Sequence, residues 1–145
     1  MVREETTNKY HFFIPVSVRF ADTDLQGHVF FGNYLTYCDE GFMAYLDRIG
    51  YSWHKLESMG FELYYVECSC QFKGRAFFGD LLLVNTRIAD LGKSSMTAEM
   101  LISKRNSDEV VAVGRITAVM ASRQTGKSTP IPDEVRVAIS KHESS

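Results

Sequence analysis

Two acids, a histidine and two glycines are grouped between Arg19 and Tyr34, and this makes the stretch the best candidate in the chain for chemistry. The acids are Asp22 and Asp24, and His28 follows them just before a segment with the pattern of a helix. A carboxylate that precedes a helix N-terminus lies near unpaired backbone N–H groups and the positive end of the helix dipole, where a substrate carbonyl can be bound and polarised. The same pattern also fits an acid that caps a helix before a glycine turn. The stretch alone therefore leaves a catalytic and a structural interpretation open.

The elements on either side of this stretch follow from the periodicity of the apolar residues. Residues 10–21 alternate as in a strand, and Pro15, which cannot donate to a neighbouring strand, indicates an edge or a bulge. From Asn33 to Ile49 the apolar residues recur with the period of a helix, which Gly50 would end. The strand face consists of Phe12, Ile14, Val16, Val18 and Phe20, and the helix stripe of Tyr34, Tyr37, Cys38, Gly41, Phe42, Tyr45, Leu46 and Ile49. Since Gly41 lies on this stripe, we expect the helix to approach a flat surface such as a sheet closely.

The remainder of the chain has mainly the pattern of strands. We expect a short helix over 52–59 capped by Ser52, strands at 61–73, 81–89, 95–104 and 110–122, and a last helix over 134–140 capped by Asp133. Residues 106–108 are Asn-Ser-Asp, which tolerate turn conformations and predict a hairpin between the last two strands. This order predicts a single α+β domain over residues 1–145, with a curved antiparallel sheet wrapped around one long helix. One helix leaves a sheet face and an edge uncovered, so we expect at least a dimer.

Composition and charge limit the classes of function. The 145 residues are 45% hydrophobic and carry a net charge of −2, so the chain can build a core but has no overall attraction for nucleic acid or anionic lipid. No apolar run is long enough for a membrane span and the N-terminus lacks the apolar core of a signal peptide, so we expect a soluble cytoplasmic protein. The four histidines and three cysteines have no metal-site spacing, so we expect no metal and no other bound cofactor.

The stretch from Asp22 to Tyr34 resembles the signature of the hotdog-fold superfamily, in its 4-hydroxybenzoyl-CoA thioesterase-like branch. That signature is approximately Asp-x-Asp-x-x-Gly-x-Val-x-aromatic-x-Asn-Tyr, and the chain has Asp-Thr-Asp-Leu-Gln-Gly-His-Val-Phe-Phe-Gly-Asn-Tyr. Residues 70–82 are similar to the family's passage between its second and third strands, and the order of elements agrees as well. The resemblance implies a hotdog fold and an acyl-CoA thioesterase, which hydrolyses an acyl- or aryl-CoA thioester to the free acid and coenzyme A.

The resemblance also implies roles for individual residues. Asp24 matches the family's catalytic carboxylate, which either attacks the thioester carbonyl or activates a water molecule. The backbone N–H of Phe31 matches the oxyanion donor, and Gly27 would let the backbone turn tightly toward the ligand. His28 could orient Asp24, touch the thioester or form only a structural hydrogen bond. Asp22 has no assigned role in the family and is expected to pair locally.

Further residues are implied for substrate binding. Tyr34, together with Asn33, frames the start of the helix, and the phosphates of coenzyme A are expected near Lys73, Arg75 and Lys93. Each exposed cation contributes about 1 kcal/mol, so no single one would be essential. The acyl pocket is expected between the helix of one subunit and the sheet of its partner in a dimer or tetramer. Aromatic side chains could line it, namely Phe30, Phe31, Tyr37, Phe42, Tyr64 and Tyr65.

Two other functions stay open, and so does a second position for the carboxylate. The first is a thioesterase that releases acyl or polyketide chains from an acyl carrier protein, although an arginine that some such relatives use on the helix is absent from residues 34–46. The second is a non-catalytic acyl-CoA-binding protein, against which the intact Asp24 argues. Other hotdog thioesterases place the carboxylate on the long helix, where Glu40 is the candidate; the presence of Asp24 favours a solvated or interface role for Glu40.

Overall fold

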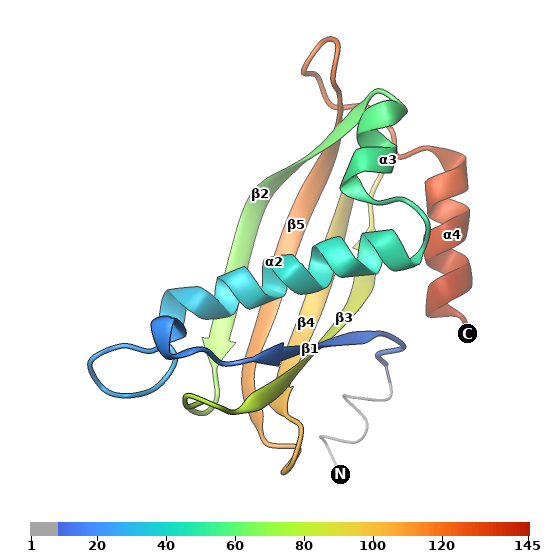
Figure 1. The fold of residues 1–145 in the computed structure, drawn as a ribbon. Coiled ribbons are helices and arrows are strands. Elements are labelled where there is room, and N and C mark those ends of the chain that lie inside the picture. The colour runs from blue at the N-terminus through green and yellow to red at the C-terminus, as the bar shows by residue number, and fades with distance from the viewer. Residues whose placement is uncertain (1–8) are drawn as a thin grey trace.

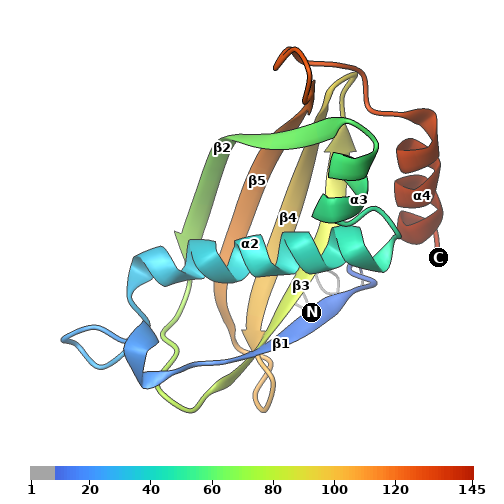
Figure 2. The same cartoon turned by 45° about the horizontal axis from the view of Figure 1, so that its top comes forward.

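A five-stranded antiparallel sheet curves around one long helix in the computed structural model, which describes residues 9–145 (Figure 1). Its strands are β1 (Phe13–Ser17), β2 (Phe61–Phe72), β3 (Leu81–Leu91), β4 (Ser95–Lys104) and β5 (Val110–Ser122), in the order β1-β3-β4-β5-β2. The long helix α2 (Phe31–Arg48) crosses one face of the sheet, as the second view shows (Figure 2). The predicted α+β architecture is confirmed.

Two glycines bring α2 and the sheet close together. A Cβ atom on Gly41 would lie 2.7 Å from Oγ1 of Thr86 and 2.7 Å from Cγ1 of Val84, both on β3. A Cβ atom on Gly114 of β5 would lie 2.5 Å from Sγ of Cys38 on the helix. Neither site has room for a larger residue, and the close approach expected at Gly41 is confirmed.

The first strand is shorter than the alternation of residues 10–21 predicts. It pairs with β3 from Phe13 opposite Asn85 to Ser17 opposite Leu81, and it forms the edge of the sheet that Pro15 indicates. The chain then turns into a 3-10 helix, η1 (Phe20–Asp22), in which the N–H of Asp22 donates to the carbonyl of Arg19 at 3.0 Å. This turn takes Phe20 off the inner face and leaves it 76% exposed, so its predicted place on that face was wrong.

The shorter helices lie near their predicted positions. In α3 (Trp53–Ser58), the side chain of Ser52 accepts a hydrogen bond from the N–H of Lys55 at 3.2 Å, which confirms the predicted cap. Helix α4 (Asp133–Glu143) is longer than expected, and Pro132 takes the capping position. Asp133 is therefore the first helical residue, where its negative charge interacts favourably with the positive end of the helix dipole.

Helix α4 is fixed to the sheet by a carboxylate. Along the edge of β3, the N–H of Thr86 donates to the carbonyl of Phe12, the residue before β1. The next such donor, the N–H of Ile88, donates to the Glu143 carboxylate at 3.0 Å. The same carboxylate accepts a hydrogen bond from the Tyr45 hydroxyl of α2 at 2.5 Å. Glu143 thus supplies an acceptor to the edge of β3 beyond the end of β1. Within residues 9–145, no helix combines the length and apolarity needed to cross a membrane.

We expect the substitution Gly41→Ala to lower the free energy of unfolding by about 1–3 kcal/mol, because the new methyl group has no space between α2 and β3. Urea unfolding measures this difference. Gly32→Ala on the same helix is the control, since its Cβ atom would meet only the exposed ring of Phe30, at 2.8 Å. Equal losses in the two variants would contradict the steric explanation.

Candidate active site

Residues 23–29 form a closed loop between η1 and α2. Thr23 and Val29 form an antiparallel bridge, and the N–H of Asp24 donates to the carbonyl of His28 at 2.9 Å. The N–H of Gly27 donates to the carbonyl of Asp24 at 2.9 Å, and Gly27 has φ of +87°, which a side chain would disfavour. The expected tight turn at Gly27 is present, and it keeps both ends of the loop together.

The Asp24 side chain is oriented but not enclosed. One carboxylate oxygen, Oδ1, accepts a hydrogen bond from the N–H of Gln26 at 2.9 Å, and the residue is only partly buried. Within the described part of the chain, Oδ2 accepts no hydrogen bond and the carboxylate forms no ion pair. One oxygen therefore fixes the rotamer while the other can meet a carbonyl carbon or a water molecule.

The start of α2 leaves a donor available beside this loop. Phe30 occupies the capping position without a side-chain cap, and its N–H donates to the carbonyl of Asp22 at 2.9 Å. Helix α2 begins at Phe31, two residues before the predicted start at Asn33. Because the first N–H groups of a helix have no acceptor within the helix, the Phe31 N–H has no acceptor among residues 9–145, and its predicted role is to bind an oxyanion.

His28 lies on the same loop but does not contact the Asp24 carboxylate by a hydrogen bond. Its Nδ1 atom is 3.2 Å from the carbonyl oxygen of Val29, and its backbone forms a bridge with Phe77. Of the three roles expected for His28, the structure contains the structural hydrogen bond. Contact with a thioester stays a prediction.

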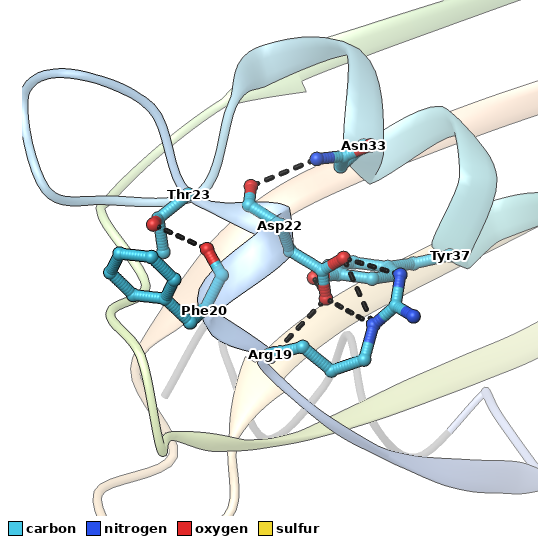
Figure 3. A network of polar contacts seen from close by, with 6 residues as sticks. All are labelled: Arg19, Phe20, Asp22, Thr23, Asn33 and Tyr37. Atoms are coloured by element: carbon cyan, nitrogen blue, oxygen red, sulfur yellow. Dashed lines mark hydrogen bonds and ion pairs between the residues drawn. The ribbon is translucent and has the colours of Figure 1, made fainter.

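Asp22 is the centre of the polar network at the junction (Figure 3). The residue is 5% exposed, and its carboxylate accepts hydrogen bonds from the Arg19 guanidinium at 2.8 and 3.2 Å and from the Tyr37 hydroxyl at 2.9 Å. The bonds from the Arg19 side chain lower the pKa of the Asp22 carboxyl, while burial opposes this effect. Asp22 pairs locally, as expected; its partner Tyr37 could not be identified from spacing, because the two residues belong to different elements.

Aromatic rings surround the helix start, with different exposures. Phe30 and Phe31 lie 4.6 Å apart between ring centroids, and Phe31 lies 6.1 Å from Phe72 at the end of β2. These three rings are 44%, 62% and 50% exposed. Tyr34 is buried against Phe72, and its hydroxyl has no hydrogen-bond partner among residues 9–145. Phe30, Phe31 and Phe72 therefore form an exposed aromatic surface, whereas Tyr34 supports it from inside.

The cations expected to bind coenzyme A lie at two ends of the sheet. Lys73 and Arg75 follow β2, at the end where β1 leads into η1 and the loop. Lys93 lies in the turn from β3 to β4, at the opposite end of the strands. All three are exposed, and their side chains form no ion pairs in the described region. Within one protomer, β3 places Lys93 the length of the sheet away from the other two, and the expected binding of coenzyme A by these three cations stays a prediction.

Grooves flank α2 on both sides. A groove of about 440 Å³ lies between α2 and β1, and Glu40 lines it together with Arg19 and Asp22. Two others, of about 350 and 250 Å³, lie between α2 and β2, and Tyr65 and Asp39 line both. The Tyr65 hydroxyl donates to Asp39 at 2.6 Å, a contact that the sequence did not indicate. Phe42 stacks on Tyr65 but is fully buried, so its expected place in the pocket lining was wrong.

We expect Asp22→Asn to lower the free energy of unfolding by about 1–3 kcal/mol at pH 7, because a buried carboxylate would no longer accept charge-assisted hydrogen bonds from the exposed Arg19 side chain. The pKa of Asp22 is lower in the folded protein than the ordinary 3.8, so this stabilisation is present above that value and is lost as the pH falls through the folded pKa. Urea unfolding at pH 7 and pH 3 should therefore give a difference between wild type and variant that shrinks at acid pH. Asp90→Asn, at an exposed position of β3, is the control; a pH-independent difference for Asp22→Asn would contradict the assignment.

Comparisons with known proteins agree with this arrangement. Residues 18–139 match the family model of the thioesterase-like superfamily. The chain is 31% identical over 123 residues to a 1,4-dihydroxy-2-naphthoyl-CoA hydrolase from Synechocystis, covering 84% of this chain and 89% of that protein. A crystal structure of a Synechocystis 1,4-dihydroxy-2-naphthoyl-CoA thioesterase superposes with a TM-score of 0.82, at 30% identity and with 89% and 95% of the two chains covered.

Two further relatives differ in extent. The structure of a gentisyl-coenzyme A thioesterase superposes with a TM-score of 0.78, at 32% identity and with 89% of this chain and 99% of that chain covered. A chloroplast acyl-acyl-carrier-protein hydrolase from Cuphea viscosissima is 40% identical over 65 residues, which are 45% of this chain and 16% of that protein. The match of the family model over most of the chain confirms the family that the Asp22–Tyr34 stretch indicated: this protein belongs to the thioesterase-like superfamily of hotdog-fold thioester hydrolases.

Proposed function

We propose that this protein hydrolyses CoA thioesters of apolar acids, with a preference for aromatic acyl groups, and that Asp24 is its nucleophile or general base. The observation that carries the proposal is the junction of loop and helix. There, an accessible carboxylate oxygen of Asp24 and the free N–H of Phe31 belong to one closed backbone unit. A thioester carbonyl bound at this junction would meet an attacking group and an oxyanion donor together.

Two routes lead from this geometry to the same products. In the first, an oxygen of Asp24 attacks the carbonyl carbon and the C–S bond breaks, so that CoA leaves as a thiolate and takes up a proton, and water then hydrolyses the mixed anhydride. In the second, Asp24 takes a proton from a water molecule, which attacks the carbonyl directly. Both routes place negative charge on the carbonyl oxygen, where the Phe31 N–H would stabilise it.

The preference for an aromatic acyl group rests on the surface beside the helix start. Phe30, Phe31 and Phe72 present exposed ring faces and edges there, and aromatic rings pack well in offset or edge-to-face arrangements. Two relatives that match more than four fifths of the chain are named for aryl-CoA substrates, which supports the same acyl class. Lys73 and Arg75, at the same end of the sheet, would bind phosphates of coenzyme A.

The second candidate substrate is a thioester of an acyl carrier protein in place of one of coenzyme A. The relative from Cuphea is named as an acyl-carrier-protein hydrolase, but it matches under half of this chain. A comparison of the same acyl group on coenzyme A and on a carrier protein therefore belongs in the test. If the carrier-bound thioester is hydrolysed with the higher kcat/KM, this second candidate replaces the first.

We further propose that the protein is a homodimer joined at β2. This strand is the second edge of the sheet, and it carries exposed Tyr64, Tyr65 and Val66. An unpaired strand edge with apolar side chains is a template for pairing with another strand. Pairing with a second copy would cover the grooves between α2 and β2, and the partner's sheet would complete the acyl pocket there.

The experiment that tests the function is a thiol-release assay with benzoyl-, hydroxybenzoyl-, naphthoyl- and linear acyl-CoA. We expect hydrolysis, with the highest kcat/KM for an aryl thioester. Asp24→Asn and Asp24→Ala should each lower kcat by about 100-fold or more, because the attacking or proton-accepting group is lost. Glu40→Gln is the matched control, since Glu40 is the carboxylate of α2 that lines the other groove. Full activity of Asp24→Asn, or a loss confined to Glu40→Gln, would contradict the proposed role of Asp24.

For the dimer, we expect Val66→Lys to shift the protein toward the monomer, because it places a charge in the middle of the apolar edge. Light scattering coupled to size-exclusion chromatography measures the molar mass. Val66 is 60% exposed, and Val137→Lys on α4, at a position that is 64% exposed, serves as the control. An unchanged mass for Val66→Lys, relative to a dimeric wild type, would place the interface elsewhere.

A further inference from the structure

Asp22 is the only charged residue that is buried among residues 9–145, and the proposed chemistry does not use it. Both oxygens of its carboxylate are satisfied. Oδ1 accepts from the Arg19 guanidinium at 2.8 and 3.2 Å, and Oδ2 accepts from the Arg19 N–H at 3.0 Å and the Tyr37 hydroxyl at 2.9 Å. A buried carboxylate whose hydrogen bonds are satisfied in this way rigidifies the segments that it joins.

The backbone carbonyl of Asp22 also forms hydrogen bonds to the start of α2. The carbonyl oxygen of Asp22 accepts hydrogen bonds from the Phe30 N–H at 2.9 Å and from Nδ2 of Asn33 at 2.8 Å. Figure 3 shows both parts of Asp22, with the side chain between Arg19 and Tyr37 and the carbonyl toward Asn33. One residue therefore links the end of η1, the capping position of α2 and its second turn.

This arrangement decides which N–H of the helix start is free. The carbonyl of Asp22 accepts the Phe30 N–H, so the Phe31 N–H is the first donor of the helix start that has no acceptor in the described part of the chain. Asp24 lies two residues after Asp22 and is held by the loop that the Thr23–Val29 bridge closes. A shift of Asp22 would thus move the carboxylate of Asp24 and the Phe31 N–H relative to each other.

We infer that Asp22 is a positioning residue, and that the Tyr37 hydroxyl and the Asn33 amide act through it to set the geometry between the Asp24 carboxylate and the Phe31 N–H. The inference rests on the proposed function. A purely structural role is the alternative, in which loss of these contacts would lower stability and leave the turnover of the folded enzyme unchanged.

The chain contains a matched pair that separates the two roles. Near its N-terminal end, α2 carries the contact from Tyr37 to the Asp22 carboxylate at 2.9 Å; near its C-terminal end it carries the contact from Tyr45 to the Glu143 carboxylate at 2.5 Å. Both tyrosines are buried. The substitutions Tyr37→Phe and Tyr45→Phe each remove one such hydrogen bond, one beside the proposed site and the other at the far end of the helix.

We expect both variants to melt at a lower temperature than wild type, while only Tyr37→Phe changes catalysis. In the thiol-release assay below the melting transition, kcat of Tyr37→Phe should fall by about tenfold with little change in KM, because misplaced groups affect the transition state more than substrate binding. Tyr45→Phe should keep the kcat of wild type. Unchanged kcat for Tyr37→Phe, or equal losses in both variants, would overturn the inference.

Amide hydrogen exchange gives a readout that does not depend on the substrate. In Tyr37→Phe the Phe30 N–H should exchange at least severalfold faster than in wild type, because its acceptor Asp22 is held less firmly, whereas Tyr45→Phe should leave that rate unchanged. An unchanged exchange rate of the Phe30 N–H in Tyr37→Phe would contradict the inference that Tyr37 holds Asp22 in place, even if the enzyme is active. Absence of hydrolysis by wild type would refute the proposed function alone, and the exchange rates would still decide the anchoring.

Discussion

The close approach of α2 to the sheet sets the arrangement of the core and of the junction. Gly41 and Gly114 remove the two side chains that would hold the helix away from β3 and β5. The helix can therefore lie directly on the sheet, where its stripe of buried residues reaches both neighbouring strands. Because a helix is rigid along its axis, this contact also fixes where its N-terminus lies, and with it the first free N–H groups.

The two ends of α2 are secured in similar ways but serve different purposes. At the C-terminal end, Glu143 joins the Tyr45 hydroxyl to the edge of β3 and so attaches α4. At the N-terminal end, Asp22 joins the Tyr37 hydroxyl to the segment that leaves β1. The contact at Glu143 holds α4 against α2 and the sheet. The contact at Asp22 lies beside the loop that carries the proposed catalytic acid.

The two acids of the Asp-Thr-Asp sequence illustrate how environment divides similar residues between structure and chemistry. Asp22 is enclosed, paired with Arg19 and satisfied at every oxygen, so it has no capacity left for a substrate. Asp24 has one oxygen held by the Gln26 N–H and one without a partner in the described structure. Their separation along the chain is two residues, yet the 3-10 turn of η1 directs one side chain inward and leaves the other in the loop.

Local pattern was sufficient for most of the fold and for the position of the junction between η1 and α2. The period of the apolar residues identified α2 and the long strands, since burial of one face imposes that period, and the grouping of acids and glycines before α2 located the junction. The early end of β1 was not predictable in this way. It depends on the turn that Arg19 and Asp22 form together, whereas the alternation of apolar residues continues through Phe20.

Residue types and their spacing were enough to predict most of the elements, the family and the composition of the junction, because these depend on neighbours along the chain. Which side chains meet depends on the folded arrangement. It paired Asp22 with Tyr37 and Asp39 with Tyr65, and it separated Lys93 from Lys73 and Arg75. Such outcomes depend on the curvature of the sheet, on strand direction and on the angle at which α2 crosses it. No local spacing encodes these quantities, because they are set by the packing of the whole core.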